Sequence, residues 1–295
     1  MAGPNHITVL GIFVADTAYR ADRAPRMGET ILGNSFALGP GGKGSNQAVA
    51  IGRLGGDVTI VSRLGDDDFA AMAEKTWQES GVKSAALRDK DSYTGAAYIF
   101  IEEASGDNAI IVCPGAAMKI TPADVDQSAD LIKGSSVLIT QLEQPIDAAQ
   151  HALQIAKLAG VTTILNPAPA AELPDEIFAL CDYITPNETE ASELTGIKVE
   201  TVVDARKAAD LLLDKGVGTV VMTLGAQGAH LHSRQRSEHV EAISAGPVVE
   251  TTGAGDAYNG GLATGLAQGL DAIEAVRLGC ATAGISVTRP GTAPS

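Results

Sequence analysis

Apolar residues occur along this chain in short continuous runs, separated by stretches in which they recur every three to four residues. The runs at 7–14 and 58–61 are almost entirely apolar, as expected of strands buried on both faces of a sheet. Further strands are expected at 137–142, 162–165, 183–185 and 219–223. Helical spacing indicates helices near 46–54, 66–80, 147–159, 188–195 and 202–215. This alternation, with right-handed crossovers, predicts a mostly parallel, doubly wound α/β sheet.

Two segments depart from this alternation in the same way. Residues 15–40 are broken by proline and glycine and show a rough two-residue alternation. Residues 93–113 are typical of two strands joined by a turn at 105–107. We expect the two segments to pair into one β-sheet lid over the carboxyl ends of the parallel strands. The chain 1–295 would then be a single α/β domain with a discontinuous lid.

Composition narrows the class of partners. A chain of 295 residues suits one large α/β domain, and 45% hydrophobic residues with 4% aromatic residues predict an aliphatic core. The formal net charge of −15, without a cluster of lysine and arginine, argues against nucleic acid and anionic membranes. We find no membrane-spanning run, no signal-peptide pattern and no metal spacing among the 3 cysteines, so we expect a cytoplasmic protein.

The main candidate for chemistry is the glycine-rich turn 251–256, which follows a β-favouring run and opens a helical stretch. Free amides beside Gly253 and Gly255, together with the positive end of the helix, would bind an anion. Asp256 would repel that anion unless its task is to take a proton from an attacking hydroxyl. Phosphoryl transfer to an alcohol needs both parts. The alternative is an ordinary acid in the first turn of a packed helix.

A second glycine-rich segment begins at Gly39. It is not a Walker phosphate loop, because Gly44 follows Lys43 where that loop requires serine or threonine. Its glycines fit the dinucleotide spacing, but no later feature supports a nicotinamide or a flavin. We interpret the segment as a tight turn whose donors, including Lys43 and Asn46, bracket a polyol.

Polar residues follow several of the expected strands, at the edge where ligands of open α/β sheets bind. They are Asp16, Glu143, Asn166, Asn187 and Glu190, together with the turn that follows Thr223. One such residue is common at a turn. Their recurrence on successive strand–helix units favours a binding site.

These stretches resemble the signatures of the ribokinase family of carbohydrate kinases, the PfkB-type superfamily. The matching segments are 41–50, 166–169, 185–190, 223–225 and 251–260, and the resemblance covers essentially the whole chain. It implies a three-layer α/β/α core with a β lid, and it implies that ATP phosphorylates a sugar, with D-ribose giving ribose 5-phosphate. Implied cofactors are Mg²⁺ and an activating monovalent cation, K⁺. The implied assembly is a homodimer through the lid.

The resemblance also implies roles for individual residues. Asp256 would be the base for the 5-hydroxyl, and the amides of Gly253, Ala254 and Gly255 would hold the phosphoryl group. The sugar hydroxyls would be held by Asp16, Gly42, Lys43, Asn46 and Glu143. The nucleotide would contact Asn187, Thr223, Gly225 and Gly228, and Glu190 would act through Mg²⁺ and its waters. The monovalent cation would lie among Glu250, Thr252, Ser286, Arg289, Gly291 and Ser295.

The chain departs from the family pattern at four points. Val14 and Ala117 replace asparagines, the first of which helps to bind the sugar. Glu250 replaces the usual aspartate of the cation site, and relatives continue past Ser295 as a short helix. The first two departures bear on the sugar, so the alternative acceptors are another furanose, such as 2-deoxyribose, or a nucleoside. A non-catalytic sugar sensor is a third interpretation, disfavoured because a sensor needs no base such as Asp256.

Val14 is the departure with the clearest expected consequence. In an extended chain Val14 and Asp16 point to the same side. Since Asp16 is expected to face the sugar, Val14 should face it too. Valine neither donates nor accepts a hydrogen bond, so we expect weaker ribose binding or a preference for a sugar that lacks the corresponding hydroxyl.

Overall fold

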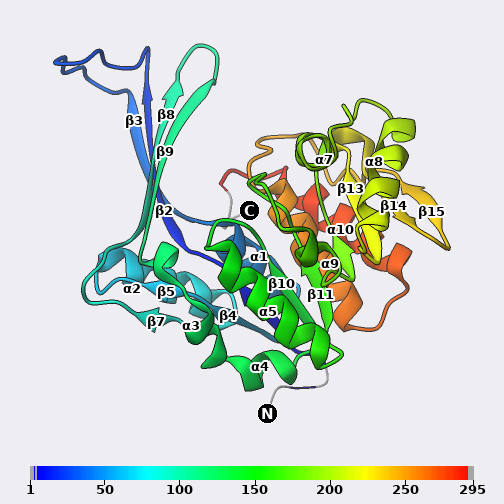
Figure 1. Cartoon of the computed structure of the whole chain (residues 1–295). Coiled ribbons are helices and arrows are strands. Elements are labelled where there is room, and N and C mark those ends of the chain that lie inside the picture. Colours follow the sequence, from blue (N-terminus) through cyan, green and yellow to red (C-terminus); the bar gives the residue numbers. More distant parts are fainter. Residues whose placement is uncertain (1–2, 4, 292–295) are drawn as a thin grey trace.

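The computed structural model describes residue 3 and residues 5–291. Its central layer is a nine-stranded sheet in the order β15-β14-β13-β12-β11-β10-β1-β4-β6 (Figure 1). The strands are β1 (Ile7–Leu10), β4 (Val58–Val61), β6 (Val82–Ser84), β10 (Val137–Thr140), β11 (Thr162–Leu165), β12 (Tyr183–Ile184), β13 (Thr219–Thr223), β14 (Ala229–Ser233) and β15 (Ser237–Val240). Neighbours from β13 to β6 are parallel, and β14 and β15 add an antiparallel edge. The predicted doubly wound sheet is confirmed.

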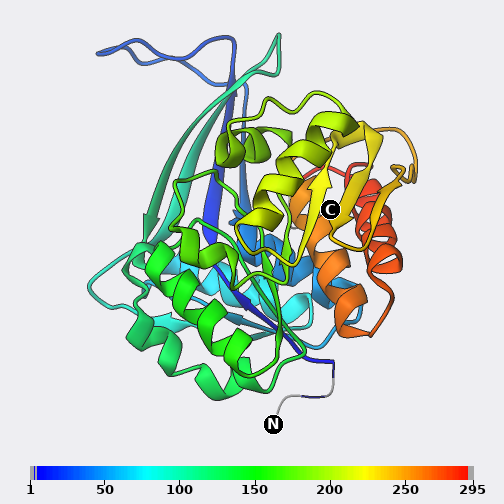
Figure 2. The same ribbon diagram turned by 45° about the vertical axis from the view of Figure 1, so that its right-hand side comes forward.

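Helices cover both faces of this sheet and complete three layers (Figures 1 and 2). One face carries α3 (Pro122–Asp126), α4 (Ala129–Lys133), α5 (Ile146–Leu158), α6 (Asp175–Phe178), α7 (Glu188–Thr195) and α8 (Val202–Asp214). The other carries α1 (Lys43–Arg53), α2 (Asp68–Glu79), α9 (Ala254–Ala267) and α10 (Ala272–Ser286). Strand side chains alternate between the two: Leu10 and Leu138 pack against the first set, Val9 and Ile139 against the second. This is why the strands read as continuous apolar runs.

Helix α9 lies between α1 and α10. A Cβ atom on Gly260 would lie 2.6 Å from the Cβ of Ala50 in α1, and one on Gly261 would lie 2.5 Å from the hydroxyl of Thr282 in α10. Two glycines side by side therefore let α9 approach both neighbours at once. This close packing fixes the first turn of α9, which carries Asp256, against the start of α1.

A second, four-stranded sheet has the order β3-β2-β8-β9 and is here named the lid sheet. Its strands are β2 (Val14–Ala21), β3 (Ser35–Gly41), β8 (Thr94–Glu102) and β9 (Asn108–Gly115). The central strands β2 and β8 are parallel, and the two outer pairs are antiparallel. The two predicted β segments therefore do pair. Both views show the far end of this sheet extending away from the core (Figures 1 and 2).

Smaller elements complete the described chain. Strands β5 (Arg63–Leu64) and β7 (Leu87–Arg88) form a short parallel pair. Single 3₁₀ turns, η1 (Ala116–Lys119) and η2 (Gly225–Gln227), follow β9 and β13.

The structure corrects the prediction of one strand at 7–14. Strand β1 ends at Leu10, and Val14 already belongs to the lid sheet. Between them the Gly11 amide donates to the Val61 carbonyl and the Ile12 carbonyl accepts from the Ser45 amide, both at 3.1 Å. The chain thus leaves the main sheet beneath α1, which an apolar run cannot reveal because both parts are buried.

Three further elements begin or end at residues other than those expected from the sequence. Asp16 lies inside lid strand β2 rather than just beyond a strand of the main sheet. Within the expected β segment 15–40 the second strand begins only at Ser35, and the helix expected at 46–54 begins at Lys43.

Candidate active site

Asp256 lies in the first turn of α9, and only 7% of it is exposed. Its Oδ2 accepts a hydrogen bond from Asn46 Nδ2 at 2.9 Å, and its Oδ1 accepts one from Gln47 Nε2 at 3.2 Å. Burial raises the pKa of this carboxyl, whereas the nearby charge of Lys43 and the two amide donors favour the ionised form. The structure therefore holds both oxygens of a buried carboxylate in fixed directions.

A chain of buried amides connects Asp256 to the ends of two strands. Gln47 Nε2 also donates to Asn166 Oδ1 at 3.1 Å, and Gln47 Oε1 accepts from Gln141 Nε2 at 2.5 Å. Asn166 directly follows β11, and Gln141 directly follows β10. Gln47 and Gln141 are not among the site residues predicted from the sequence. The one available signal was an amide at the end of a buried strand.

The turn before α9 has the backbone expected of an anion site. Gly253 adopts a φ of 81°, in the left-handed region that glycine tolerates. The Ala254 amide donates to the Thr251 carbonyl at 3.2 Å. The amides of Gly253, Gly255 and Asp256 have no acceptor among the described residues. Three N–H groups at the positive end of a helix are therefore unbonded, and Asp256 rather than Ala254 supplies the third.

Two further carboxylates lie beside this turn. The backbone amide of Lys43 donates to Glu143 Oε2 at 2.7 Å, which joins α1 to the segment after β10. Burial raises the pKa of Glu143 to about 7, against the opposing charge of Lys43. Burial, reinforced by the charge of Asp256, raises the pKa of Asp16 to about 6. Gly42 is the N-cap of α1, and Asn46 donates to Asp256, so the structure brings all five residues expected at the sugar into one neighbourhood.

A cavity of about 590 Å³ lies on the other side of the turn. Four of the five residues expected to bind the nucleotide line it: Asn187, Thr223, Gly225 and Gly228. Ala254 and Gly255 of the turn line it too, so the cavity reaches the anion site. The apolar wall of this cavity was not predicted from the sequence; it includes Ala242, Ile243, Val248, Tyr258, Cys280, Ala283 and Val287. These residues look like ordinary core positions in the sequence.

Glu190, the fifth expected nucleotide residue, does not line this cavity. It forms a capping box at the start of α7: Asn187 Oδ1 accepts from the Glu190 amide at 2.8 Å, and Glu190 Oε2 accepts from the Asn187 amide at 2.9 Å. Burial raises the pKa of Glu190, and the charges of Lys43 and Asp256 also act on it. Glu190 thus belongs to the charged group around Asp256 while also fixing a helix terminus.

The two segments expected around a monovalent cation lie side by side. The amides of Val249 and Glu250 both donate to the Val287 carbonyl, at 2.7 and 3.2 Å. The Gly291 amide donates to Glu250 Oε2 at 2.8 Å. Ser286 and Arg289 belong to the second segment, and Thr252 follows the first. Ser295 lies outside the described residues.

Side chains alone do not make a metal site here. Among the described residues, no group of three or more histidine, cysteine, aspartate or glutamate side chains is placed to hold an ion. A monovalent cation between these segments would therefore depend on backbone carbonyls, which are suitable ligands for K⁺.

The sequence also matches proteins of known class. The model of the pfkB family carbohydrate kinases matches residues 4–295, nearly the whole chain. The chain belongs to the pfkB family. This pfkB kinase is therefore a phosphotransferase with an alcohol group as acceptor, as predicted, and the interpretation as a non-catalytic sensor loses its support.

Relatives of this pfkB kinase share its full length. A ribokinase of Haemophilus influenzae is 39% identical over 290 residues, which cover 98% of this chain and 94% of the relative. A deoxyribokinase of Salmonella typhi is 35% identical over 291 residues, again 98% and 94% of the two chains. The structure of Arabidopsis thaliana ribokinase complexed with ribose and ATP superposes with a TM-score of 0.92 at 30% identity, covering 100% of this chain and 95% of that one. The ribokinase-like fold is confirmed.

Within the described residues of this pfkB kinase, no helix combines the length and apolar character needed to cross a bilayer.

Proposed function

We propose that this pfkB kinase transfers the γ-phosphoryl group of ATP to the 5-hydroxyl of D-ribose, giving ribose 5-phosphate and ADP. The observation that carries the proposal is the position of Asp256 and its turn. They lie between a 590 Å³ cavity and the group formed by Asp16, Lys43 and Glu143. A nucleotide on one side and a sugar on the other would meet at Asp256. Several relatives matched over nearly the whole chain are ribokinases, and the ribokinase of Arabidopsis thaliana was solved with ribose and ATP.

Asp256 acts as the general base in this reaction. It accepts the proton of the 5-hydroxyl as that oxygen bonds to the γ-phosphorus, while the bond from the γ-phosphorus to the ADP oxygen breaks. Burial raises its pKa, which makes it a better proton acceptor, whereas the charge of Lys43 and the amide donors of Asn46 and Gln47 favour its ionised form. The unbonded amides of the turn stabilise the charge on the phosphoryl oxygens.

The sugar is held by acceptors and donors of the neighbouring group. Asp16 and Glu143, when ionised, accept hydrogen bonds from two hydroxyls, and Lys43 donates to a third. Gly42 lets the start of α1 approach the sugar, and Asn46 adds a side-chain donor or acceptor. These assignments agree with those implied by the family resemblance.

Two ions complete the proposal. Glu190 is buried, acidic and near Lys43 and Asp256, and both its oxygens are already hydrogen-bonded to Asn187. This fits contact with Mg²⁺ through water rather than directly, and bound Mg²⁺ supplies positive charge to the phosphates. Glu250 and the carbonyls of the adjoining segment fit a K⁺ ion that would shape the turn before Gly253.

We further propose that the chain acts as one domain whose lid sheet closes over the sugar, and that two copies associate through the lid. The Tyr19 ring lies tilted beside the rings of Phe36 and Tyr98, with centroids 5.1 and 5.5 Å apart, on the strand face opposite Asp16. All three rings are exposed, as are Leu38 and Ile111. Exposed apolar side chains gathered on one face of a sheet favour burial against a second copy, which sedimentation would detect as a dimer. A monomer at micromolar concentration would contradict the dimer.

We propose that the protein is located in the cytoplasm. Cys113, Cys181 and Cys280 are free thiols, which fits a reducing compartment, and the cytoplasm also supplies ATP.

A specific observation favours 2-deoxyribose as a second acceptor. Val14 is only 3% exposed and packs with Ile12, Ala97 and Ala117 in one apolar cluster. The two departures that bear on the sugar, Val14 and Ala117, are thus neighbours. Strand pairing places Ala97 opposite Asp16, so this cluster adjoins the carboxylate proposed to hold the sugar. A sugar hydroxyl directed at the cluster would lack a partner, at a cost of roughly 1–3 kcal/mol, whereas a C–H group would pack.

The deciding experiment measures ADP formation with a panel of pentoses, hexoses and nucleosides. Turnover of D-ribose, with ribose 5-phosphate identified as product, supports the proposal. If only nucleosides are turned over, the proposed substrate is a nucleoside and not ribose. If no compound of the panel leads to ADP formation, the proposed function is wrong.

The acceptor preference is tested by kcat/KM for ribose and 2-deoxyribose. Val14→Asn should shift the ratio toward ribose by about tenfold, since one recovered hydrogen bond contributes about 0.5–1.5 kcal/mol. Val203→Asn is a matched control, because Val203 is exposed on α8, outside the lid sheet and outside the apolar cluster. An unchanged ratio in Val14→Asn would mean that Val14 does not influence the sugar.

A further inference from the structure

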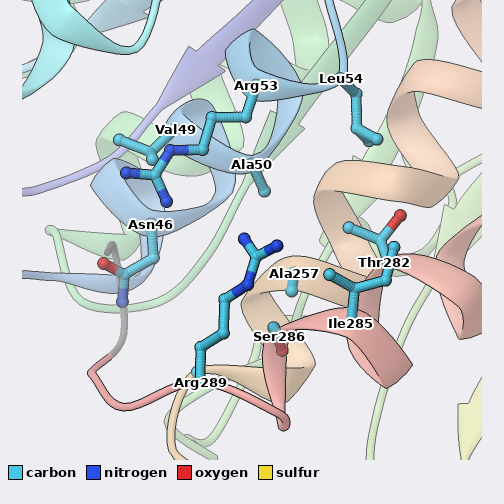
Figure 3. A pocket seen from close by; sticks show the side chains of 11 residues that line it. Asn46, Val49, Ala50, Arg53, Leu54, Ala257, Thr282, Ile285, Ser286 and Arg289 are labelled. Carbon is cyan, nitrogen blue, oxygen red and sulfur yellow. The ribbon is translucent and has the colours of Figure 1, made fainter. Parts of the chain in front are cut away.

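The first turn of α9 borders an open space on one side. A cavity of about 200 Å³ lies between this turn, α1 and the end of α10, and Ala257 of the turn faces it (Figure 3). The close packing of α9 at Gly260 and Gly261 lies one turn further along the helix. Asn259 follows Ala257 by two residues, or about 200° around the helix, so it lies on the opposite face. The first turn is therefore held less by packing than by its polar contacts.

Asn259 joins this turn to the end of β12. It is 1% exposed, its Nδ2 donates to the Gly255 carbonyl at 2.9 Å, and its Oδ1 accepts from Thr185 Oγ1 at 2.7 Å. Thr185 directly follows β12 and is buried to the same degree. The Thr185 carbonyl accepts from Asn166 Nδ2 at 3.1 Å, and Asn166 in turn is bonded to Gln47.

These contacts close a buried ring that begins and ends at Asp256. Its members, in order, are Asp256, Gln47, Asn166, Thr185, Asn259 and Gly255. Every side-chain oxygen and nitrogen of the four residues that link Asp256 to Gly255 has a hydrogen-bond partner. A buried polar network that is fully satisfied is rigid, so the ring can hold the turn in one position.

Backbone carbonyls fix the direction of the hydrogen bonds in this ring. A carbonyl can only accept, so the amide nitrogens of Asn259 and Asn166 must face the carbonyls that they contact. Their amide oxygens then face Thr185 Oγ1 and Gln47 Nε2, which have to donate. Gln47 Nε2 is thereby directed as a donor at Asp256 Oδ1. The ring therefore favours the ionised carboxylate that a general base requires.

Asn259 is also an unfavourable residue for its place in the chain. It lies inside α9, where asparagine lowers helix stability because its side chain competes for backbone groups. A residue that breaks a local rule of this kind is expected where function requires it.

We propose that Thr185 and Asn259 are positioning residues for phosphoryl transfer, acting through the peptide between Gly255 and Asp256. A peptide unit is planar and trans, so its N–H points away from its C=O. By binding the Gly255 carbonyl, Asn259 sets the direction of the Asp256 amide, which has no acceptor within the described chain. Neither side chain needs to touch a substrate. Their role rests on the proposed function, in which this turn holds the transferring phosphoryl group.

The experiment compares two substitutions of Thr185. Thr185→Val removes the hydroxyl but keeps the branched shape, so Asn259 Oδ1 loses its donor. We expect kcat to fall by roughly ten- to hundredfold with little change in the KM values for ATP and acceptor, because a small misplacement of a reacting group slows the reaction without weakening binding. Thr185→Ser keeps the hydroxyl and removes a buried methyl group, so it should lower the midpoint of thermal unfolding while kcat stays near the natural value.

Thr264→Val is the matched control. Thr264 lies in the same helix, is 2% exposed, and its Oγ1 donates to the Gly260 carbonyl at 2.8 Å, outside the ring. Its hydroxyl should therefore matter for the unfolding midpoint and not for kcat. If kcat follows the unfolding midpoint across the three variants, the role of Thr185 is structural and the proposal is wrong.

A measurement without substrate separates this proposal from the proposed function. The backbone amide resonances of Gly255 and Asp256, followed by nuclear magnetic resonance, should move in Thr185→Val, stay in place in Thr264→Val and return in Thr185→Ser. If no compound of the panel is phosphorylated, the proposed function fails, yet these resonances still report whether the ring holds the turn. Unmoved resonances in Thr185→Val would overturn the role of the ring.

Discussion

Replacing Asp256 by asparagine should remove the proton acceptor while leaving the fold in place. The carboxylate accepts from Asn46 Nδ2 at 2.9 Å and from Gln47 Nε2 at 3.2 Å, so the amide of the variant would present one donor to another donor. Gln47 cannot turn to relieve this, because its amide is also bonded to Asn166 and Gln141. Asn46 can turn, because its Oδ1 has no hydrogen-bond partner within the described chain.

The magnitudes follow from this asymmetry. A turned Asn46 would offer Oδ1 to the new amide and keep both hydrogen bonds, so the free energy of unfolding should change by less than about 1 kcal/mol. Loss of the charge is itself stabilising, because burial raises the pKa of Asp256. Turnover should fall by roughly 10²–10⁴, the usual contribution of a positioned base. That corresponds to about 2.7–5.5 kcal/mol in the activation free energy.

The assay compares kcat from ADP release, sugar affinity from calorimetry and the midpoint of thermal unfolding. We expect a large loss in kcat with little change in the other two quantities. Near-normal turnover would end the assignment of Asp256 as the base. A large drop in the unfolding midpoint would show instead that Asn46 does not turn, and the reasoning about the amide network would be wrong.

Three other predictions concern the cation, the lid and pH. K⁺ should stimulate turnover more than Na⁺, but the K⁺ concentration needed should be higher than with the usual aspartate. The reason is that the Glu250 side chain is longer than aspartate and already accepts a hydrogen bond from the Gly291 amide. Equal rates in K⁺ and in buffer without either ion would contradict this prediction. Amide hydrogen exchange in the lid sheet should slow when sugar binds, since closure excludes water; unchanged exchange with binding shown separately would exclude sugar-driven closure. The kcat/KM for sugar should decline as the pH falls from about 8 to about 5. Glu143 and Asp16, with pKa values of about 7 and about 6, become protonated over this range and accept fewer hydrogen bonds from sugar hydroxyls. A flat profile over this range would refute the prediction.

The main sheet could be predicted because its signal is local. The strands expected at 58–61, 162–165 and 219–223 match β4, β11 and β13 at both ends, since each is a run buried on both faces between breakers. The helix expected at 188–195 matches α7, which the Asn187–Glu190 capping box begins. The glycine turn before α9 was also visible, because glycine spacing and an adjoining acid are local features.

The other features of the site depend on contacts between residues far apart in the chain, which the local sequence pattern does not show. Gln47 meets Gln141 and Asn166 across separations of 94 and 119 residues, so the network behind Asp256 emerges only in the folded chain. Val14 and Ala117 are likewise distant in sequence and adjacent in space. The apolar wall of the nucleotide cavity has the composition of a core, so only its exposure to the cavity distinguishes it.

The short link between β1 and β2 has a mechanical consequence. Because the Ile12 carbonyl is bonded beneath α1, a swinging motion of the lid sheet would pivot near Phe13. At about 3.3 Å per residue, Asp16 lies about 10 Å from this pivot and Ala21 about 26 Å. A swing of about 15° would displace Ala21 by about 7 Å but Asp16 by less than about 3 Å. The far end of the lid sheet would therefore move by a large distance on closure. Asp16, close to the pivot, would stay near the position in which it binds the sugar.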